Sequence, residues 1–141
     1  NLGDCRVETL RPTADVSANW IAVPTTAGNW RHVADVSTSV SSYIQTSLAG
    51  TRDLYTVGDM SFVPVTVYAV VPTFLTQKVD AGSLPVRSVI ISGAETTVGS
   101  AVAPFLSVLA WNQSIFTQNP DGATGWTYST VNALQLGIET I

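Results

Sequence analysis

Short runs of strand-forming residues, separated by turn residues at intervals of roughly ten positions, constrain this chain most strongly. Valine and threonine dominate these runs, and few stretches keep the apolar period of a helix. At 141 residues the chain is most simply one domain, long enough to bury a core between two packed layers. The pattern therefore predicts an all-β fold, an antiparallel β-sandwich or jelly roll that spans residues 1–141.

The predicted strands alternate in polarity or are apolar throughout, and turn residues separate them. They cover residues 6–10, 42–46, 52–57, 63–75, 86–92, 95–102, 105–111 and 135–141. Both faces of residues 63–75 are apolar, so we expect a central strand there, paired antiparallel with residues 86–92. Pro12 is expected to end the first strand, and Leu136 and Ile138 are expected to face the core from the last one.

One short helix is expected near the C-terminus, where Thr127 follows a glycine-rich turn. Threonine is a good N-cap, and residues 128–134 are long enough for about two helical turns. Trp126 is then expected to pack this helix onto the sheet. Residues 14–42 are the least regular part, and we interpret them as a long loop with a short strand at residues 30–33.

The chain is poor in charge, with 11% charged residues against about 25% in typical soluble domains. This composition indicates either that part of the surface meets another protein or that serine and threonine solvate the surface instead. The net charge is −4 and the six basic residues are scattered singly, which argues against a nucleic-acid partner. No apolar run approaches the roughly 20 residues of a membrane span, so no membrane partner is expected.

The residue types that carry out catalysis do not form a recognisable set. Glycoside hydrolysis needs two nearby carboxylates, yet no two acids stand at i and i+2 on one strand. His32 is the single histidine and no Gly-x-Ser-x-Gly motif surrounds a serine, so we interpret His32 as exposed or capping. Cys5, beside Arg6, is interpreted as a small residue that fills a sheet position. We therefore expect a protein that is not an enzyme.

Metal and cofactor sites are equally poorly supported. One cysteine and one histidine cannot complete a zinc site. Asn119 and Asp121 offer oxygen ligands for a weak calcium site, but a turn in which Asp121 and Gly122 reverse the chain is the simpler interpretation. No glycine-rich phosphate loop is present, and we expect neither a metal nor a cofactor.

The four tryptophans divide into two groups. Trp111 is in phase with its apolar neighbours and is assigned to the core, as is Trp126. The other two lie in the irregular loop, each directly after an asparagine, and the candidate contact residues are Trp20, Trp30, Asn19 and Asn29. They pack internally, anchor a protein interface or stack on a glycan. In the glycan case, Trp30→Ala should abolish sugar binding without unfolding the domain.

Several blocks carry a resemblance to a known family. Residues 3–15 read G-D-C-R-V-E-T-L-R-P-T-A-D, residues 119–127 read N-P-D-G-A-T-G-W-T, and residues 131–138 read V-N-A-L-Q-L-G-I. Trp111 and the segments 46–55 and 78–82 occur in the family's order between them. With these blocks the chain resembles a family of tailed-bacteriophage virion proteins over nearly its whole length.

The resemblance implies a jelly-roll or concanavalin-like sandwich located in the virion. It implies a non-enzymatic structural protein, either a surface-displayed capsid decoration (cement) protein or a tail, neck or fibre component. The partners would be other capsid or tail proteins and further copies of the chain, most simply in a trimer. The alternative is a carbohydrate-binding module that attaches the particle to a host glycan. Residues 73–79 and 101–104 are more apolar than the family pattern, which indicates an added contact or an altered core.

Overall fold

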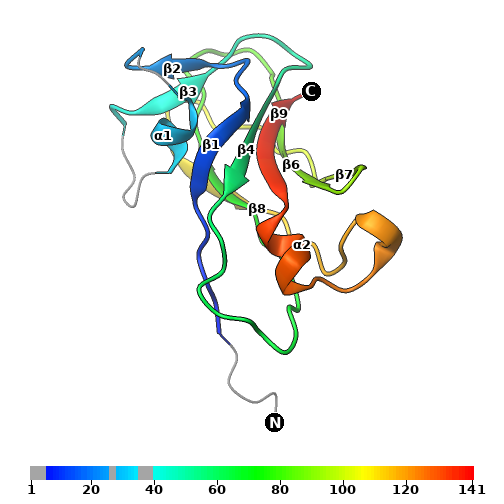
Figure 1. Ribbon diagram of the computed structural model, residues 1–141. Coiled ribbons are helices and arrows are strands. Elements are labelled where there is room, and N and C mark those ends of the chain that lie inside the picture. Colours follow the sequence, from blue (N-terminus) through cyan, green and yellow to red (C-terminus); the bar gives the residue numbers. More distant parts are fainter. Residues whose placement is uncertain (1–5, 26–27, 35–39) are drawn as a thin grey trace.

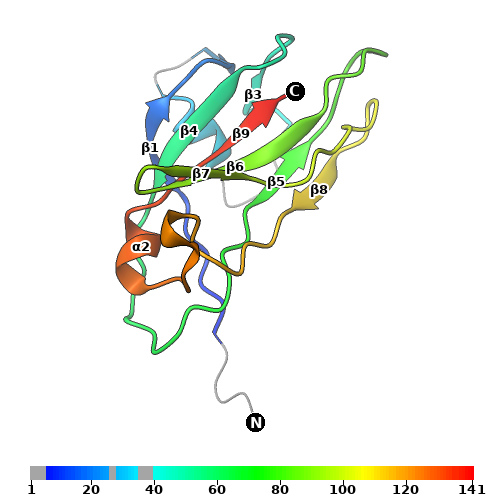
Figure 2. The ribbon, with the colours of Figure 1, turned by 90° about the vertical axis from the view of Figure 1, so that its right-hand side faces the viewer.

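One five-stranded antiparallel sheet dominates the structure, with the strand order β1-β4-β9-β6-β7. The computed structural model describes residues 6–25, 28–34 and 40–141. The strands are β1 Pro12–Ser17, β4 Arg52–Val57, β9 Gln135–Thr140, β6 Val86–Ser92 and β7 Glu95–Val98. Figure 1 shows β1, β4 and β9 side by side, and Figure 2 shows the molecule after a quarter turn. The predicted all-β architecture is confirmed.

A second, narrower layer lies behind this sheet. β5 (Thr73–Thr76) and β8 (Ala110–Gln113) pair antiparallel as a two-stranded unit, which we call the ribbon. In Figure 2 the ribbon stands to one side of the sheet, next to β6. The hydroxyl of Ser88 on β6 donates a hydrogen bond to the hydroxyl of Ser114, 2.8 Å away. Sheet and ribbon thus form the two unequal layers of a sandwich.

The irregular region beside β1 holds three short elements. β2 (Ile21–Val23) pairs with β3 (Tyr43–Gln45), and the single helical turn α1 (Trp30–Val33) packs against β1. The strand predicted at residues 30–33 is therefore wrong. The carboxylate of Asp15 accepts the N–H groups of Asn29 and Trp30, at 2.9 and 2.7 Å, and so satisfies two donors at the start of the helical turn.

His32 lies in α1 and is buried, so its expected exposure to solvent is wrong. Its Nδ1 lies 2.9 Å from the hydroxyl of Ser42 in a hydrogen bond that joins α1 to the start of β3. A buried polar ring of this kind needs such partners, because an unpaired buried group costs free energy. The position of His32 therefore serves the packing of this region.

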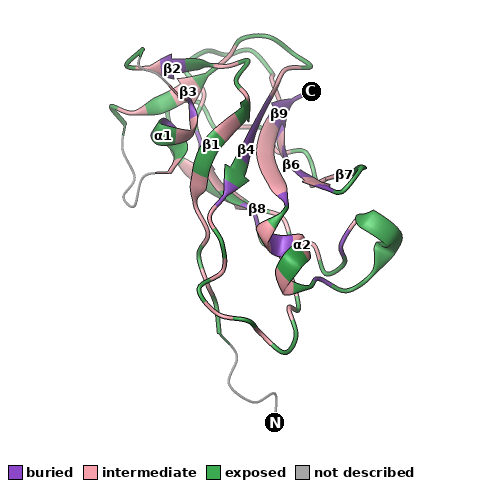
Figure 3. Ribbon diagram, viewed as in Figure 1, coloured by how far each residue is buried: buried purple, intermediate pink, exposed green. Residues whose placement is uncertain are grey.

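The core lies where the sheet, the extension of the ribbon and a C-terminal helix meet. Figure 3 shows buried positions on β4, β6 and that helix. The central cluster comprises Val57, Ile90, Trp126, Val131 and Leu134. Trp126 is 4% exposed, and its Nε1 donates to the carbonyl of Phe116 at 2.8 Å. Burial of each such large apolar side chain contributes roughly 1.5–3 kcal/mol, and the predicted packing role of Trp126 is confirmed.

The C-terminal helix α2 (Tyr128–Asn132) begins where the sequence predicts. The Thr127 hydroxyl accepts the N–H of Thr130 at 3.2 Å, and the Thr130 hydroxyl accepts the N–H of Thr127 at 2.9 Å. A cap of this kind stabilises a helix by about 1 kcal/mol. The side chain of Asn132 accepts the N–H of Met60 at 2.9 Å, which ties the helix to the segment after β4.

Residues 63–75 do not form the predicted central strand, and that prediction was wrong. Within this stretch the first strand is β5, which begins at Thr73, and Val65 is fully exposed. Pro64 and Pro72 cannot donate to a sheet ladder, so they disfavour the segment as a central strand. β6 pairs instead with β7 and β9. The strands predicted at 52–57 and 86–92 are confirmed at β4 and β6.

The first predicted strand is displaced along the chain. Residues 6–11 have no regular secondary structure, and β1 starts at Pro12, where the prediction ended the strand. Proline is compatible with the first position of an edge strand, and β1 is an edge of the sheet. The carboxylate of Glu8 accepts the N–H of Ser61 at 2.7 Å, which places this segment beside the residues that follow β4.

β9 is the central strand of the sheet, and Gly137 permits its close approach to β4. A Cβ atom on Gly137 would lie 2.0 Å from the carbonyl oxygen of Asp53 and 2.8 Å from Cδ2 of Leu54, so no other residue fits without a shift. Leu136 packs against the core cluster as predicted. Ile138 lies on the same side of the strand and is half-buried.

Candidate interaction surface

The outer face of the ribbon, which points away from the sheet, is the candidate functional surface. Thr73 stands opposite Gln113 and Leu75 opposite Trp111, and cross-strand partners share a face. A bridge between Val70 and Phe116 continues the same register. Because alternate residues share a face, the outer positions are Val71, Thr73, Leu75, Gln77, Leu109, Trp111, Gln113 and Ile115.

The inner face of the ribbon is identified by its contacts. Thr76 is buried and accepts a hydrogen bond from the Asn112 side-chain amide at 2.8 Å. Ser114 meets Ser88 of the sheet, and Phe116 packs against the core cluster. Along residues 109–116 exposed and half-buried positions alternate without exception, as expected for a strand with one covered face. The odd-numbered residues therefore point to solvent.

The outer face combines high exposure with an absence of charge. Trp111 is 65% exposed and Ile115 is 64% exposed, while Val71 and Leu109 are exposed to a smaller extent. The remaining positions are leucine, threonine or glutamine, so none of the outer positions carries a charge. Contiguous apolar surface of this kind is typical of protein–protein contact sites.

The assignment of Trp111 to the core was wrong, although its phase with Leu109 was right. The two layers are close where Ser114 on the inner face meets the sheet. A Cβ atom on Gly99 would lie 2.0 Å from the Ser114 hydroxyl and 2.5 Å from the Ser88 hydroxyl. The hydrogen bond between Asn112 and Thr76 lies on this inner face, and Trp111 lies on the opposite, exposed side. The sequence carries no local signal for this, because the even positions include Asn112 and Phe116 as well as Ala110 and Ser114.

The segment before β8 extends the apolar surface at the tip of the ribbon. Phe105, Leu106 and Val108 are all exposed. The N–H of Lys78 donates to the carbonyl of Phe105 at 3.0 Å, and the N–H of Ser107 donates to the carbonyl of Lys78 at 2.8 Å. These bonds hold this exposed segment against the end of β5, beside the tip of the outer face.

The candidate contact residues at the two Asn-Trp pairs come together elsewhere, around two aspartates. The carboxylate of Asp53 accepts the N–H groups of Asn19 and Trp20, just as Asp15 accepts those of Asn29 and Trp30. Each pair is therefore held to the sheet by one carboxylate. Both bonds of each pair come from backbone N–H groups, so each carboxylate fixes the main chain of one dipeptide.

The side chains in this network are used by the fold itself. The Asn29 amide is buried and donates to the carbonyl of Trp20 at 2.8 Å and to Asp53 at 2.6 Å. The Asn19 amide donates to the carbonyl of Arg52 at 2.6 Å. Both indoles are half-buried, and the Arg31 guanidinium lies 5.1 Å from the ring centre of Trp30. The structure thus brings the four predicted residues together, with their side-chain amides bonded internally.

Asp53 also fixes the protonation of a neighbouring phenol. Asp53 is fully buried and accepts a hydrogen bond from the Tyr55 hydroxyl at 3.1 Å. Burial and the adjacent carboxylate raise the pKa of Tyr55 above its ordinary value, so the phenol stays protonated and acts as a donor. The buried carboxylate of Asp53 therefore accepts hydrogen bonds from the neutral phenol of Tyr55, from two backbone N–H groups and from the side-chain amide of Asn29.

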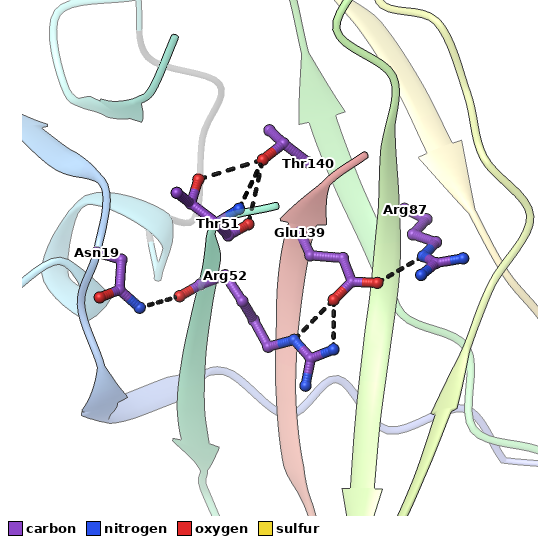
Figure 4. A network of polar contacts seen from close by, with 6 residues as sticks. All are labelled: Asn19, Thr51, Arg52, Arg87, Glu139 and Thr140. Carbon is purple, nitrogen blue, oxygen red and sulfur yellow. Dashed lines mark hydrogen bonds and ion pairs between the residues drawn. The ribbon is translucent and has the colours of Figure 1, made fainter. Parts of the chain in front are cut away.

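The opposite side of the molecule, the sheet outer face, carries a row of charges. Arg87 is adjacent to Ser88, which faces the ribbon, so Arg87 points the other way. Arg52, Glu139 and Arg87 stand side by side on β4, β9 and β6 (Figure 4). Nε of Arg52 donates to Glu139 at 2.7 Å, with a second bond from Nη2, and Nε of Arg87 donates at 2.5 Å. Burial opposes ionisation of Glu139, but the two arginines outweigh it and hold its pKa below the usual value.

Two hollows of the described surface are lined mainly by uncharged residues. One, of about 380 Å³, is lined by uncharged residues between β7 and the end of β8, including Ser114 and Ile115. Another, of about 230 Å³, contains Asp80 as its single ionisable residue. Among the described residues, no group of three or more metal-ligating side chains occurs, and no helix is long and apolar enough to cross a bilayer. Cys5 lies outside the described residues.

The possible calcium ligands form a turn, as the simpler interpretation proposed. The side chain of Asn119 is buried and accepts the N–H of Asp121 at 3.3 Å. The N–H of Asn119 donates to the carbonyl of Thr124 at 2.7 Å, across the short 3₁₀ turn η1 (Asp121–Ala123). The asparagine, together with Gly122 at positive φ, reverses the chain.

Comparisons with protein-family models, with curated proteins and with solved structures found no match for this chain.

Proposed function

We propose that the chain is a non-enzymatic structural protein of a tailed-phage virion that binds neighbouring proteins through the outer face of the ribbon. The observation that carries the proposal is the uncharged, apolar outer face, on which Trp111 and Ile115 are both largely exposed. Exposing such side chains to water is unfavourable, and burial against another protein recovers that free energy. The residues that the structure describes leave this face without a second layer.

The virion setting comes from the resemblance at residues 3–15 and 119–138. Within it, a capsid decoration protein and a tail, neck or fibre component both act through surface complementarity repeated around a symmetry axis. The apolar departure from the family pattern at residues 73–79 includes all of β5. Of the two explanations for that departure, an added contact agrees with the exposure of the ribbon.

Immunogold labelling of intact particles of the encoding phage tests the setting. Gold over the whole head would support a decoration role, and gold confined to the tail would support a tail, neck or fibre role. Particles that carry no gold, although the antibody detects the purified chain, would overturn the proposal.

A pair of variants tests the surface. Particles produced with Trp111→Arg should lose the label, because a charge on the outer face must be desolvated when the face is covered. Leu48→Arg is the matched control, since Leu48 is about as exposed as Trp111 but lies in the turn before β4. Equal labelling of both variants would show that another surface attaches the chain to the particle.

A further inference from the structure

We infer that the occupant of the ribbon's outer face is a second copy of this chain, packed face to face in a two-fold symmetric dimer. The inference rests on the proposed function, which assigns this face to protein contact, and goes beyond it by naming the partner.

Charge is the first reason for a self-partner. The chain has a net charge of −4, so two copies repel each other wherever their acids approach. The outer face carries neither acid nor base, and the nearest charge at the ribbon tip, Lys78, donates its ammonium to the carbonyl of Gly82. Face-to-face contact therefore desolvates no charge on either copy. A charged partner would find no group of opposite sign on this face.

Geometry is the second reason. A two-fold axis that lies in the plane between two ribbons places the face that carries the Thr73–Gln113 and Leu75–Trp111 pairs of one copy against the same face of the other. Two such ribbons pack with their strands within about 30° of each other and about 10 Å apart. The hydroxyl of Thr73 and the amide of Gln113 provide both donors and acceptors, so each copy can satisfy the polar groups of the other. The same patch is used on both copies, as two-fold symmetry requires.

Area is the third reason. An open large apolar side chain offers on the order of 150–200 Å², so the exposed parts of Val71, Leu109, Trp111 and Ile115 and of Phe105, Leu106 and Val108 amount to roughly 700 Å². A standard stable interface buries about 800 Å² per partner, whereas the largest patch on a typical monomer is about 300–600 Å². The surface is therefore large enough for a dimer. Dimerisation closes after two copies, which departs from the trimer expected from the virion setting.

The purified chain, studied by sedimentation velocity and light scattering between about 1 and 100 μM, tests the inference. We expect twice the chain mass for the wild type and for Leu48→Arg, and the monomer mass for Trp111→Arg. Circular dichroism should show the same fold and a melting temperature within about 2 °C of the dissociated wild type for each variant. If Trp111→Arg does not fold, Gln113→Arg replaces it, because Gln113 is exposed on the same face.

A wild type that stays monomeric at 100 μM would overturn the inference. A trimer would overturn it too, as would a dimer that neither Trp111→Arg nor Gln113→Arg dissociates. These results are separable from a failure of the proposed function. If the wild type is a monomer in solution and particles produced with Trp111→Arg carry no gold, the outer face binds a different virion protein. Unlabelled wild-type particles together with a Trp111-dependent dimer would instead retain the dimer and remove the virion role.

Discussion

The two outer faces of the sandwich differ in how far their apolar side chains are exposed to solvent. On the sheet outer face, Leu54 and Val89 are 8% and 0% exposed, although they share that face with the solvent-side arginines. On the ribbon outer face, the largest side chain, Trp111, is mostly exposed. Both faces belong to antiparallel strands, so strand type does not explain the difference.

The width of each layer explains it. In the five-stranded sheet β9 has a neighbour on each side, so Arg52 and Arg87 reach Glu139 from two different strands. Leu54 leans over Gly137, which has no side chain of its own. Within the part of the chain that the structure describes, each ribbon strand has only one neighbour in the ladder, so no third row of side chains covers its apolar residues. In a wide sheet, side chains of neighbouring strands cover the apolar residues, whereas those of a narrow ribbon stay exposed unless another molecule covers them.

The largest expected effect comes from filling the space at Gly137. Gly137→Val should destabilise the fold by about 3 kcal/mol or more, because the new side chain meets the backbone of Asp53 and displaces Leu54. Urea unfolding followed by circular dichroism measures this. Gly125→Val is the matched control, since a Cβ there has no neighbour within 4 Å and should change stability little. Equal stability of the two variants would mean that the sheet outer face is not closed by this contact.

Glu139→Gln is expected to cause a smaller loss of folding stability. The substitution leaves two guanidinium groups around a neutral amide, and we expect a destabilisation of about 2 kcal/mol, between the values for exposed and buried ion pairs. Chemical denaturation measures it, with Glu95→Gln as the control for the same change at an exposed acid. Indistinguishable unfolding midpoints for the two variants would contradict a stabilising role for the charged row.

The same carboxylate predicts a pH dependence. Because the folded pKa of Glu139 lies below its usual value of 4.5, its ionisation stabilises the fold above that pH. This contribution is lost as the pH falls through the folded pKa. The wild-type melting temperature should therefore fall on acidification below about pH 4.5, and it should fall less steeply in Glu139→Gln. The bond to Ser61 also lowers the pKa of Glu8, so part of the pH dependence of the melting temperature should persist in the Glu139→Gln variant. Parallel profiles would show that Glu139 does not contribute.

The smallest effect on intrinsic stability is expected on the ribbon. Trp111→Ser should change the free energy of unfolding of the dissociated chain by no more than about 0.5 kcal/mol, since the indole is mostly in solvent. The wild-type melting temperature should rise with protein concentration, because association stabilises the folded chain, and that of the variant should not. Scanning calorimetry at several concentrations measures both. A large loss at the lowest concentration would place Trp111 in the core after all.

Much of the fold was accessible from local sequence signals. Strands β4 and β6 and the cap at Thr127 were predicted at their observed positions, because alternation and capping depend on residues only a few positions apart. The candidate site was less accessible. The Asn-Trp pairs were candidate contact residues, with internal packing as one alternative, and they surround Asp15 and Asp53, distant residues that no local pattern connects to them.

By itself the sequence determined that this chain is an antiparallel β protein with a short C-terminal helix and few charges. Only the tertiary structure decided which side of residues 109–115 faces inward, because alternation defines two faces without saying which is covered. The contact of Ser114 with Ser88 and Gly99 shows that the even positions face the sheet, which leaves Trp111 outside. The tertiary structure likewise excluded residues 63–71 from the main sheet and gave the central position to β9, where a glycine permits the tight contact with β4.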